Sequence, residues 1–368
     1  MFTKVTSVFA ALTVLLFSTA VFFNADARPF YKGKRIIFLG NYPAGGANST
    51  EGRIFAAHIA KHIPGKPKII FRDMGGAGGL VATNYLAEAA RPNGMTVGFF
   101  TWNPVAQVLK DPGLRVDYPD LQFVAAAAPP VICYIRKDAA PGGINSPQDF
   151  FKKARGFKFG GLRTTSTHDL KGRLSLDLLI GPENYKTVTG YRGFTPIFAA
   201  IHQNEVQYHT TSIPGYRRVV EPTMEKPGLV KVLYQYETPT VDGRYLRSPN
   251  LPNLPTWLEV YKMKNGKNAM PSGMKWKTLK FLNTLNSQLF RMVFLPPKAP
   301  KAALEALRTA FSAVTKDKEF LAAYKKAIKA KPAVIVGKKG EAIINATLRN
   351  VDPKMVSFLR QYVKSGGK

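Results

Sequence analysis

The feature that most constrains the fold is a pair of glycine-rich loops, each between a short apolar strand and a helix. The first loop follows residues 35–40 and contains Gly45 and Gly46, and the second follows residues 68–72 and contains the glycines at 75, 76, 78 and 79. Glycine has no Cβ, so its backbone can approach a ligand closely. The helix that follows directs free N–H groups and its positive dipole end toward the loop. Two such loops side by side predict a receptor for a carboxylate or phosphate group.

Strand and helix patterns alternate through the first part of the chain. The predicted strands are 35–40, 68–72 and 95–101, and the predicted helices between them are 48–62 and 80–90. This βαβαβ order predicts a parallel sheet with right-handed crossovers. Ligands of such sheets bind beyond the carboxyl ends of the strands, where both glycine loops lie.

A second α/β unit is expected after the paired prolines at 129 and 130. A chain of 368 residues is long enough for two domains, each with its own core. Residues 239–288 are rich in Pro, Asn, Gly and Lys, which predicts an irregular segment. An apolar strand at 289–295 and amphipathic helices follow it.

The first 27 residues have the pattern of a secretory signal peptide. Lys4 precedes a mostly apolar stretch, and Ala25-Asp26-Ala27 fits a small-x-small cleavage site. A membrane anchor is the alternative, but the stretch is short for a span and Thr13 interrupts it. The chain has one cysteine, Cys133, so it cannot form an internal disulfide. We therefore expect an exported protein in a bacterial periplasm, with Cys133 buried in a strand.

The formal net charge is +30, which attracts anions. Nucleic acid is one possible partner. However, the basic residues are spread along the chain, and an exported protein rarely meets nucleic acid. We therefore expect no nucleic-acid partner, and instead an anionic solute or an acidic surface on a membrane partner.

Six short motifs, in order, resemble those of the solute-binding receptors of tripartite tricarboxylate transporters, the Bug or TctC-like receptors. The motifs are PAGGANSTEGR at 43–53, GAGG at 76–79, RPNGMT at 91–96, YRG at 191–193 with Pro196 and Glu205-Val206, LPTWLE at 254–259 and LPPKAP at 295–300. The chain departs from the family at Ser49, where the family usually has Asp, at Asn93 in the turn, and at Asn204-Glu205. Each motif alone is weak, but together they cover most of residues 33–325.

The resemblance implies an α/β, two-domain periplasmic binding protein of the Venus-flytrap type, each domain a mainly parallel sheet flanked by helices. Domain 1 would comprise residues 28–130 plus 289–368, and domain 2 residues 131–288, after a signal peptide at 1–27. The implied function is a monomeric receptor that captures a small organic carboxylate between the domains. It would deliver this anion to the membrane subunits of a transporter, without a cofactor, a metal or enzymatic activity.

The ligand carboxylate is expected between the two glycine loops, where backbone N–H groups and the side chain of Asn48 or Ser49 would bind it. Asn48 or Ser49 is also expected to cap the first helix. A run of hydroxyl residues would face the other end of the ligand, although a helix cap with solvated neighbours explains the same run. Arg163 and Arg192 could bind a distal carboxylate or be surface charges. The predicted ligand-binding residues are Ala44, Gly45, Gly46, Asn48, Ser49, Gly76, Ala77, Gly78, Gly79, Thr164, Thr165, Ser166, Thr167, His168, Tyr191 and Gly193.

Enzyme classes fit the sequence less well. A dinucleotide fingerprint would need a third glycine where Val81 stands, and the segment around Ser49 does not form G-x-S-x-G. His58 and His62 have helical spacing for a shared metal, but no third ligand lies nearby in the sequence. A sensing or scavenging receptor that serves no transporter stays open as the alternative, and a carboxylate-processing enzyme is a weaker one.

Overall fold

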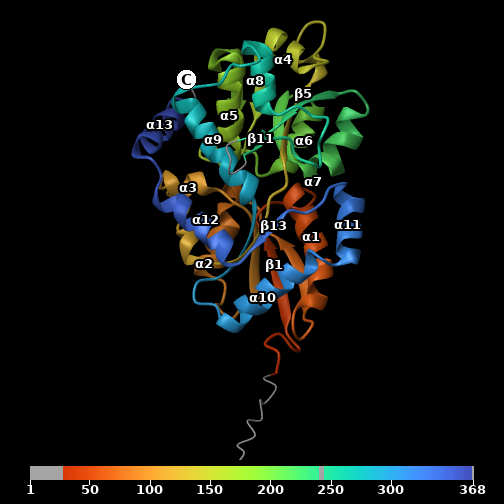
Figure 1. The fold of residues 1–368 in the computed structure, drawn as a ribbon, viewed down its shortest axis with the longest axis vertical. Coiled ribbons are helices and arrows are strands. Elements are labelled where there is room, and N and C mark those ends of the chain that lie inside the picture. The colour runs from red at the N-terminus through yellow and green to blue at the C-terminus, as the bar shows by residue number, and fades with distance from the viewer. Residues whose placement is uncertain (1–27, 240–243, 367–368) are drawn as a thin grey trace, which may run out of the picture.

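The chain folds into two lobes, each built on one β-sheet (Figure 1). The structure is a computed structural model that describes residues 28–239 and 244–366. The predicted signal peptide at 1–27 lies outside the described residues. Below we call the lobe that contains the first strand lobe A and the other lobe B.

Lobe A is built on a six-stranded sheet in the order β13-β4-β12-β3-β1-β2. The strands are β1 (Arg35–Gly40), β2 (Lys68–Asp73), β3 (Thr96–Thr101), β4 (Gln122–Ala127), β12 (Arg291–Leu295) and β13 (Val334–Val336). The predicted βαβαβ unit is confirmed, because β1 pairs in parallel with both β2 and β3. In contrast, β12 runs antiparallel to β3 and β4, and β13 runs antiparallel to β4. The sheet is therefore mixed and parallel only in its first part, so the prediction of a mainly parallel sheet is wrong for this lobe.

Helices cover this sheet. They are α1 (Ala47–Ile59), α2 (Leu80–Glu88), α3 (Pro104–Val108), α10 (Lys301–Val314), α11 (Lys318–Ile328) and α12 (Lys338–Arg349). Phe55 of α1 packs between Phe99 of β3 and Phe311 of α10, at ring-centroid distances of 5.7 and 5.6 Å. This apolar packing joins helices from both ends of the chain to one sheet and fixes the position of the loop that precedes α1.

Lobe B has a five-stranded mixed sheet in the order β7-β6-β8-β5-β9. Its strands are β5 (Val131–Arg136), β6 (Phe157–Gly160), β7 (Tyr185–Val188), β8 (Tyr208–Ser212) and β9 (Val230–Gln235), with a small hairpin of β10 (Thr238–Pro239) and β11 (Tyr245–Leu246). Its helices are α4 (Pro147–Lys153), α5 (Thr167–Ile180), α6 (Phe194–His202), α7 (Ile213–Gly215), the π-helix η6 (Tyr216–Glu225), α8 (Trp257–Asn265) and α9 (Gly273–Gln288). Cys133 is buried in β5, as predicted.

Single-turn 3₁₀ helices occur in both lobes. They are η1 (Ala60–His62), η2 (Ala77–Gly79), η3 (Tyr118–Asp120), η4 (Lys137–Ala139) and η5 (Pro182–Asn184).

The prediction of an irregular segment at 239–288 is wrong, because α8 and α9 occupy about half of it. Thr256 caps α8 through a capping box with Glu259, and Trp257 packs on Trp276 of α9 at 5.6 Å between ring centroids. The prolines, glycines and asparagines gather in the loops that flank these helices, so composition averaged over the segment concealed them.

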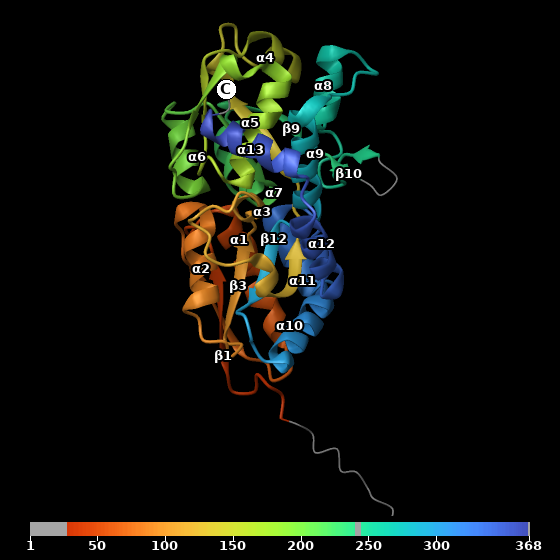
Figure 2. The same ribbon diagram turned by 90° about the vertical axis from the view of Figure 1, so that its left-hand side faces the viewer.

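The last helix, α13 (Pro353–Lys364), lies on lobe B (Figure 2). Leu359 and Tyr362 are buried with the apolar core around α5, and an Arg173 guanidinium N–H donates to the carbonyl of Tyr362 at 3.1 Å. The division into residues 28–130 plus 289–368 and 131–288 remains a proposal. In this proposed division, α13 belongs to domain 1 by sequence but packs on domain 2.

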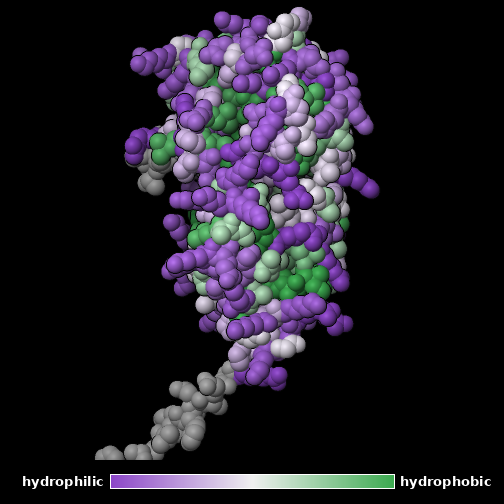
Figure 3. Space-filling view, turned by 90° about the vertical axis from the view of Figure 1, so that its right-hand side faces the viewer, coloured by the Kyte–Doolittle hydropathy of each residue, from purple (hydrophilic) through white to green (hydrophobic). Residues whose placement is uncertain are grey.

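Within residues 28–239 and 244–366, no helix combines the length and the apolar character that crossing a membrane requires. On the face drawn in Figure 3, hydrophilic residues cover most of both lobes, and apolar areas are small and separated.

Candidate ligand-binding site

The first glycine loop meets lobe B directly at the seam, the surface where the two lobes touch. A Cβ added to Gly193 would lie 2.7 Å from Cδ of Pro43, so the two loops are in close contact. The Thr195 hydroxyl donates to the carbonyl of Ala44 at 3.4 Å. Gly45 is exposed beside this contact, and Gly46 is buried. The structure thus brings together the predicted residues 44–46 and Gly193.

The second glycine loop lies beside the first and also faces lobe B. The Tyr42 hydroxyl donates to the carbonyl of Gly78 at 3.0 Å, which links the two loops. A Cβ on Gly78 would lie 3.1 Å from Cδ of Arg163 in lobe B. The N–H of Gly79 donates to the carbonyl of Gly76 at 2.9 Å, so this amide closes a turn. Ala77 is exposed.

Asn48 and Ser49 bind groups of lobe A. The helix α1 starts at Ala47 with Gly46 as its cap, so the prediction that Asn48 or Ser49 caps it is wrong. The Asn48 amide donates to the carbonyl of Phe99 at 3.0 Å, and the Ser49 hydroxyl donates to Asp73 at 3.2 Å. In this arrangement both side chains hold the α1 end of the seam in place.

The hydroxyl run at 164–167 divides into different environments. Thr164 is exposed, and the Ser166 hydroxyl caps α5 by accepting from the N–H of Asp169. Thr167 bridges the lobes, because its hydroxyl donates to the side-chain oxygen of Asn103 in lobe A at 2.8 Å. The cap interpretation therefore holds for Ser166.

Tyr191 lies at the edge of this region, half-buried, and its hydroxyl donates to Glu205 at 2.5 Å. Arg192 is exposed. Whether Tyr191 contacts a ligand stays a prediction, as do the ligand-binding roles of the other residues of the seam.

A buried group of rings lies behind the loops. The ring centroid of Phe194 is 4.8 Å from that of His168, 5.4 Å from that of His209 and 5.4 Å from that of Tyr42. Burial lowers the pKa of His168 well below its usual range, and the charges of nearby groups lower it further. Burial also lowers the pKa of His209 to about 3. Both imidazoles are therefore neutral at pH 7 and give an anion no positive charge. The single N–H of His209 donates to the carbonyl of Gly160 at 2.8 Å, so its Nε2 is an acceptor.

Several polar groups of the seam were missed by the sequence analysis. The donors Trp102 Nε1, Asn103 Nδ2 and Thr211 Oγ1 are buried without a hydrogen-bond partner in the protein, as are the acceptors His209 Nε2 and, from a residue already predicted, Asn48 Oδ1. Trp102 and Asn103 come directly after β3, at the strand end where a ligand of such a sheet is expected, and that position was the available signal. N–H and O–H groups left unpaired in a buried seam favour a ligand that accepts hydrogen bonds.

Asp111 of lobe A forms a latch with lobe B. An Arg163 N–H group donates to both of its carboxylate oxygens, at 3.0 and 2.8 Å, and the Thr165 hydroxyl donates at 2.5 Å. Thr165 and Arg163, both considered as ligand contacts, are thus engaged with protein in this arrangement.

The Asp111→Asn variant is expected to weaken the latch. We expect a loss of about 1 kcal/mol in the free energy of unfolding, since the Arg163 side chain is 30% exposed and screening reduces the value of the pair. Urea unfolding and small-angle scattering measure this loss and the accompanying expansion. Asp117→Asn, an exposed neighbour, is the matched control. Identical results for both variants would show that the latch does not hold the lobes together.

The buried histidines predict a pH dependence of stability. Because the folded pKa of His209 is about 3 and its usual value is 6.5, the unfolded chain binds more protons between these values. The stability that the neutral imidazole provides is complete above pH 6.5 and is lost as pH falls through this window. We expect His209→Phe to reduce the slope of unfolding free energy against pH by up to about 1.4 kcal/mol per pH unit, measured by urea unfolding.

The pH slopes of the unfolding free energy must be compared between wild type and variant, because the pKa shift of another buried group changes stability with pH in the opposite direction. Burial raises the pKa of Asp169 to about 7, which favours the folded state at lower pH. Asp169 is present in both proteins, so the difference between the slopes isolates His209. The exposed His202→Asn variant should keep the wild-type slope. A wild-type slope in His209→Phe would contradict the assignment.

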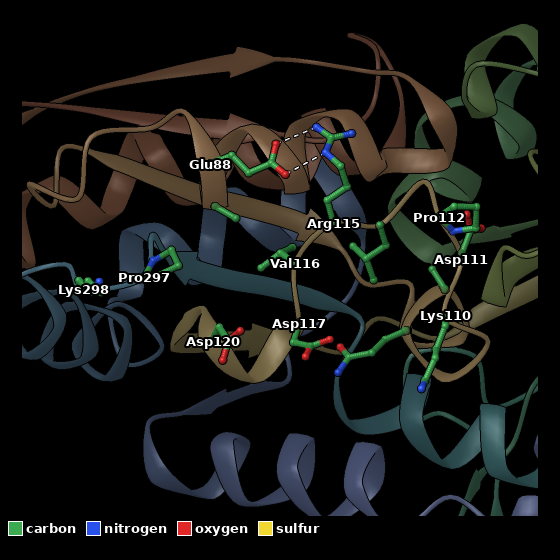
Figure 4. A pocket seen from close by; sticks show the side chains of 14 residues that line it. Glu88, Lys110, Asp111, Pro112, Arg115, Val116, Asp117, Asp120, Pro297 and Lys298 are labelled. Carbon is green, nitrogen blue, oxygen red and sulfur yellow. Dashed lines mark hydrogen bonds and ion pairs between the residues drawn. The ribbon is translucent and has the colours of Figure 1, made fainter.

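A hollow of about 900 Å³ lies on lobe A, and no residue of the glycine loops lines it (Figure 4). Arg115 crosses it and donates to both carboxylate oxygens of Glu88, at 2.8 and 2.7 Å. Its wall carries Lys110 and Lys298 as well as Asp117 and Asp120, so its charges are of both signs. The seam is the better candidate site, because both glycine loops meet lobe B there and no residue of these loops lines the hollow.

No metal site is apparent in the part of the chain that the structure describes. No group of three or more potential ligands comes together among those residues. His62, considered above with His58, instead lies 2.7 Å from the Asp317 carboxylate.

Comparisons with known proteins agree on the fold. No protein-family model matches this sequence, and no curated protein matches it by sequence. Among solved structures, the periplasmic binding protein BugD is similar with a TM-score of 0.65 at 15% identity, covering 90% of this chain and 98% of BugD. MatC from Rhodopseudomonas palustris, solved with bound malate, has a TM-score of 0.61 at 19% identity and covers 89% of this chain and 99% of MatC. Another R. palustris protein, solved with adipate, has a TM-score of 0.65 at 17% identity, over 90% of this chain and 97% of that one.

These similarities extend over nearly the whole length of each solved protein. The two mixed sheets and their flanking helices are therefore parts of one known architecture. This chain has the two-lobed α/β fold of the Bug and TctC-like periplasmic binding proteins.

Proposed function

We propose that this protein is a periplasmic solute-binding receptor that captures a small organic carboxylate between its lobes. The observation that carries the proposal is the seam itself, where two glycine loops of lobe A face the loop at Gly193 of lobe B. Buried donors without protein partners line the same seam. An anion held by several such donors gains charge-assisted hydrogen bonds.

The seam offers a carboxylate hydrogen bonds and little free positive charge. His168 and His209 are neutral at pH 7, and Arg291, the arginine buried at the seam, is paired with Glu51. Recognition would therefore depend on N–H and O–H donors and on closure of the lobes. MatC, solved with malate, and the similar R. palustris protein, solved with adipate, suggest dicarboxylates as the first ligands to test.

A thermal-shift screen of mono-, di- and tricarboxylates on the mature protein tests this proposal. A ligand at 100 times its dissociation constant should stabilise the folded state by about 2.7 kcal/mol. Adipamide, the uncharged diamide of adipate, is the matched control and should have no effect. Stabilisation by uncharged solutes, with no response to any carboxylate, would contradict the proposal. Recovery of the bound ligand unchanged would separate a receptor from a carboxylate-processing enzyme.

Delivery to a tripartite transporter is the finer part of the proposal. Its basis is the resemblance of the six motifs together with the fold. Uptake of the ligand by vesicles that contain the two membrane subunits should require this protein. Ligand binding without any stimulation of uptake would instead support a sensing or scavenging receptor.

The periplasmic location can be tested separately. Cleavage after Ala27 should leave Arg28 as the first residue of the protein recovered from the periplasm. An uncleaved chain found in the membrane fraction would favour the anchor.

A further inference from the structure

A separate cavity of about 280 Å³ lies where the chain crosses between the lobes. Its wall includes 128–131, the crossing from β4 to β5, and the end of α9 at Asn286 and Ser287, just before the crossing to β12. No residue of the glycine loops lines it. The volume is just below the roughly 300–1,000 Å³ typical of pockets for drug-sized ligands, so it suits a smaller molecule.

A chain of buried polar side chains forms one wall. The Lys171 ammonium group donates to the Asn283 side-chain oxygen at 2.9 Å. The Asn283 amide nitrogen in turn donates to the backbone carbonyl of Glu237 at 2.7 Å and to its Oε1 at 3.2 Å. All three side chains are at least nine-tenths buried. The wall therefore carries one basic and one acidic side chain, and burial lowers the pKa of Lys171 to about 7 and raises the pKa of Glu237.

Two acceptors of this wall have no partner. Glu237 Oε2 and the Asn286 side-chain oxygen are buried without a hydrogen bond in the described structure, and both residues line the cavity. Leaving buried acceptors unpaired is unfavourable, which favours an occupant that donates hydrogen bonds to both.

The cavity also carries basic groups. Lys171, on the same wall as Glu237, lies 3.8 Å above the ring of Tyr236, and Lys331 lines the cavity as well. A ligand with both an ammonium group and a carboxylate would match the acidic and the basic groups of this cavity.

We propose that this hinge cavity is a second ligand site, for a small free amino acid in its zwitterionic form. Glu237 and Asn286 hold its ammonium group, and Lys171 and Lys331 face its carboxylate. The site is distinct from the anion site in the seam, because the two share no residue.

Occupancy of this cavity also bears on lobe closure. The Asn250 side chain donates to the carbonyl of Lys331 at 3.2 Å and accepts from its N–H at 2.9 Å, which ties the hairpin side of lobe B to lobe A across the cavity. A molecule bound between them stabilises one relative position of the lobes. The amino acid and the seam ligand therefore change each other's affinity by the same factor.

The test is calorimetric titration of the full mature protein with L-alanine, L-serine and L-proline. Propionate and ethylamine, which carry only one of the two charges, are the matched probes. We expect binding of at least one amino acid, no binding of either single-charge probe, and an affinity at least tenfold weaker in Glu237→Gln. If no amino acid binds, or if Glu237→Gln retains wild-type affinity, the proposal is overturned.

A second variant covers a failure of Glu237→Gln to fold. Asn286→Leu keeps a similar side-chain volume but removes the unpaired oxygen. It should also lower the affinity for the amino acid at least tenfold. Wild-type affinity in Asn286→Leu would overturn the proposal. A carboxylate from the screen of the seam, added in excess, should leave the number of amino-acid sites unchanged. Direct displacement would place the amino acid in the seam and overturn the second site while leaving the receptor function intact.

Discussion

Replacing Arg291 by alanine is expected to lower the free energy of unfolding by about 3–5 kcal/mol, because it leaves a buried carboxylate without its cation. Arg291 and Glu51 are both completely buried, and Arg291 Nε lies 3.3 Å from Glu51 Oε2. The Tyr324 hydroxyl donates to the other carboxylate oxygen at 2.6 Å. A loss of this size is a large fraction of the stability of an ordinary domain and is measurable by urea unfolding.

Arg291 also contacts both lobes, so it contributes to their closure as well as to stability. It is the first residue of β12 in lobe A, and its guanidinium donates to the Thr101 hydroxyl of β3. It also donates to the Ser212 hydroxyl, at the end of β8 in lobe B, at 3.0 Å. One buried side chain therefore links both sheets at the base of the seam.

A double variant separates the effect of the unpaired Glu51 charge from the effect of the packing that the Arg291 side chain provides. Glu51→Leu with Arg291→Met removes both charges together, and such replacements are often neutral or stabilising. We expect the double variant to recover most of the stability that Arg291→Ala loses, but to lack the bond to Ser212. A double variant as unstable as Arg291→Ala would show that packing, and not the unpaired Glu51, accounts for the loss.

The early strands and loops were predictable because their signals are local. The apolar runs at β1, β2 and β3, and the glycines between them, define strand, loop and helix within a few residues. The Ser166 cap and the capping box at Thr256 are equally local. The box was read as a family motif and not as the start of a helix, and the surrounding composition then led to the wrong prediction.

The antiparallel half of the lobe A sheet and the buried Glu51–Arg291 pair could not be predicted from the sequence, for a different reason. Strand β12 pairs with β3 across the whole of lobe B, and neither segment encodes that register locally. Glu51 and Arg291 are likewise separated by all of lobe B, so nothing near either residue marks it as buried and paired. The two sides of the seam, however, each carried a recognisable loop, and the fold brings these loops together.

Gly193→Ala is expected to weaken ligand binding at least tenfold, which is about 1.4 kcal/mol or more. The φ angle of Gly193 is 172°, extended backbone that alanine adopts without strain, so the local fold should persist. The new Cβ would lie 2.7 Å from Cδ and 3.2 Å from Cγ of Pro43, in a ring that cannot rotate away. The lobes must therefore separate slightly, and the closed arrangement becomes less populated.

A graded series makes this prediction sharper. Gly193→Val adds further atoms at the same contact and should weaken binding more than Gly193→Ala. The exposed Thr189→Val places no new bulk against Pro43 and should bind nearly as wild type. Titration with the most stabilising carboxylate from the screen measures affinity, and small-angle scattering measures the separation of the lobes. Urea unfolding should show less than about 0.5 kcal/mol of change in Gly193→Ala, because only the contact between lobes is altered. Equal affinity and equal scattering across the series would mean that the ligand is not held by closure of lobe B onto Pro43.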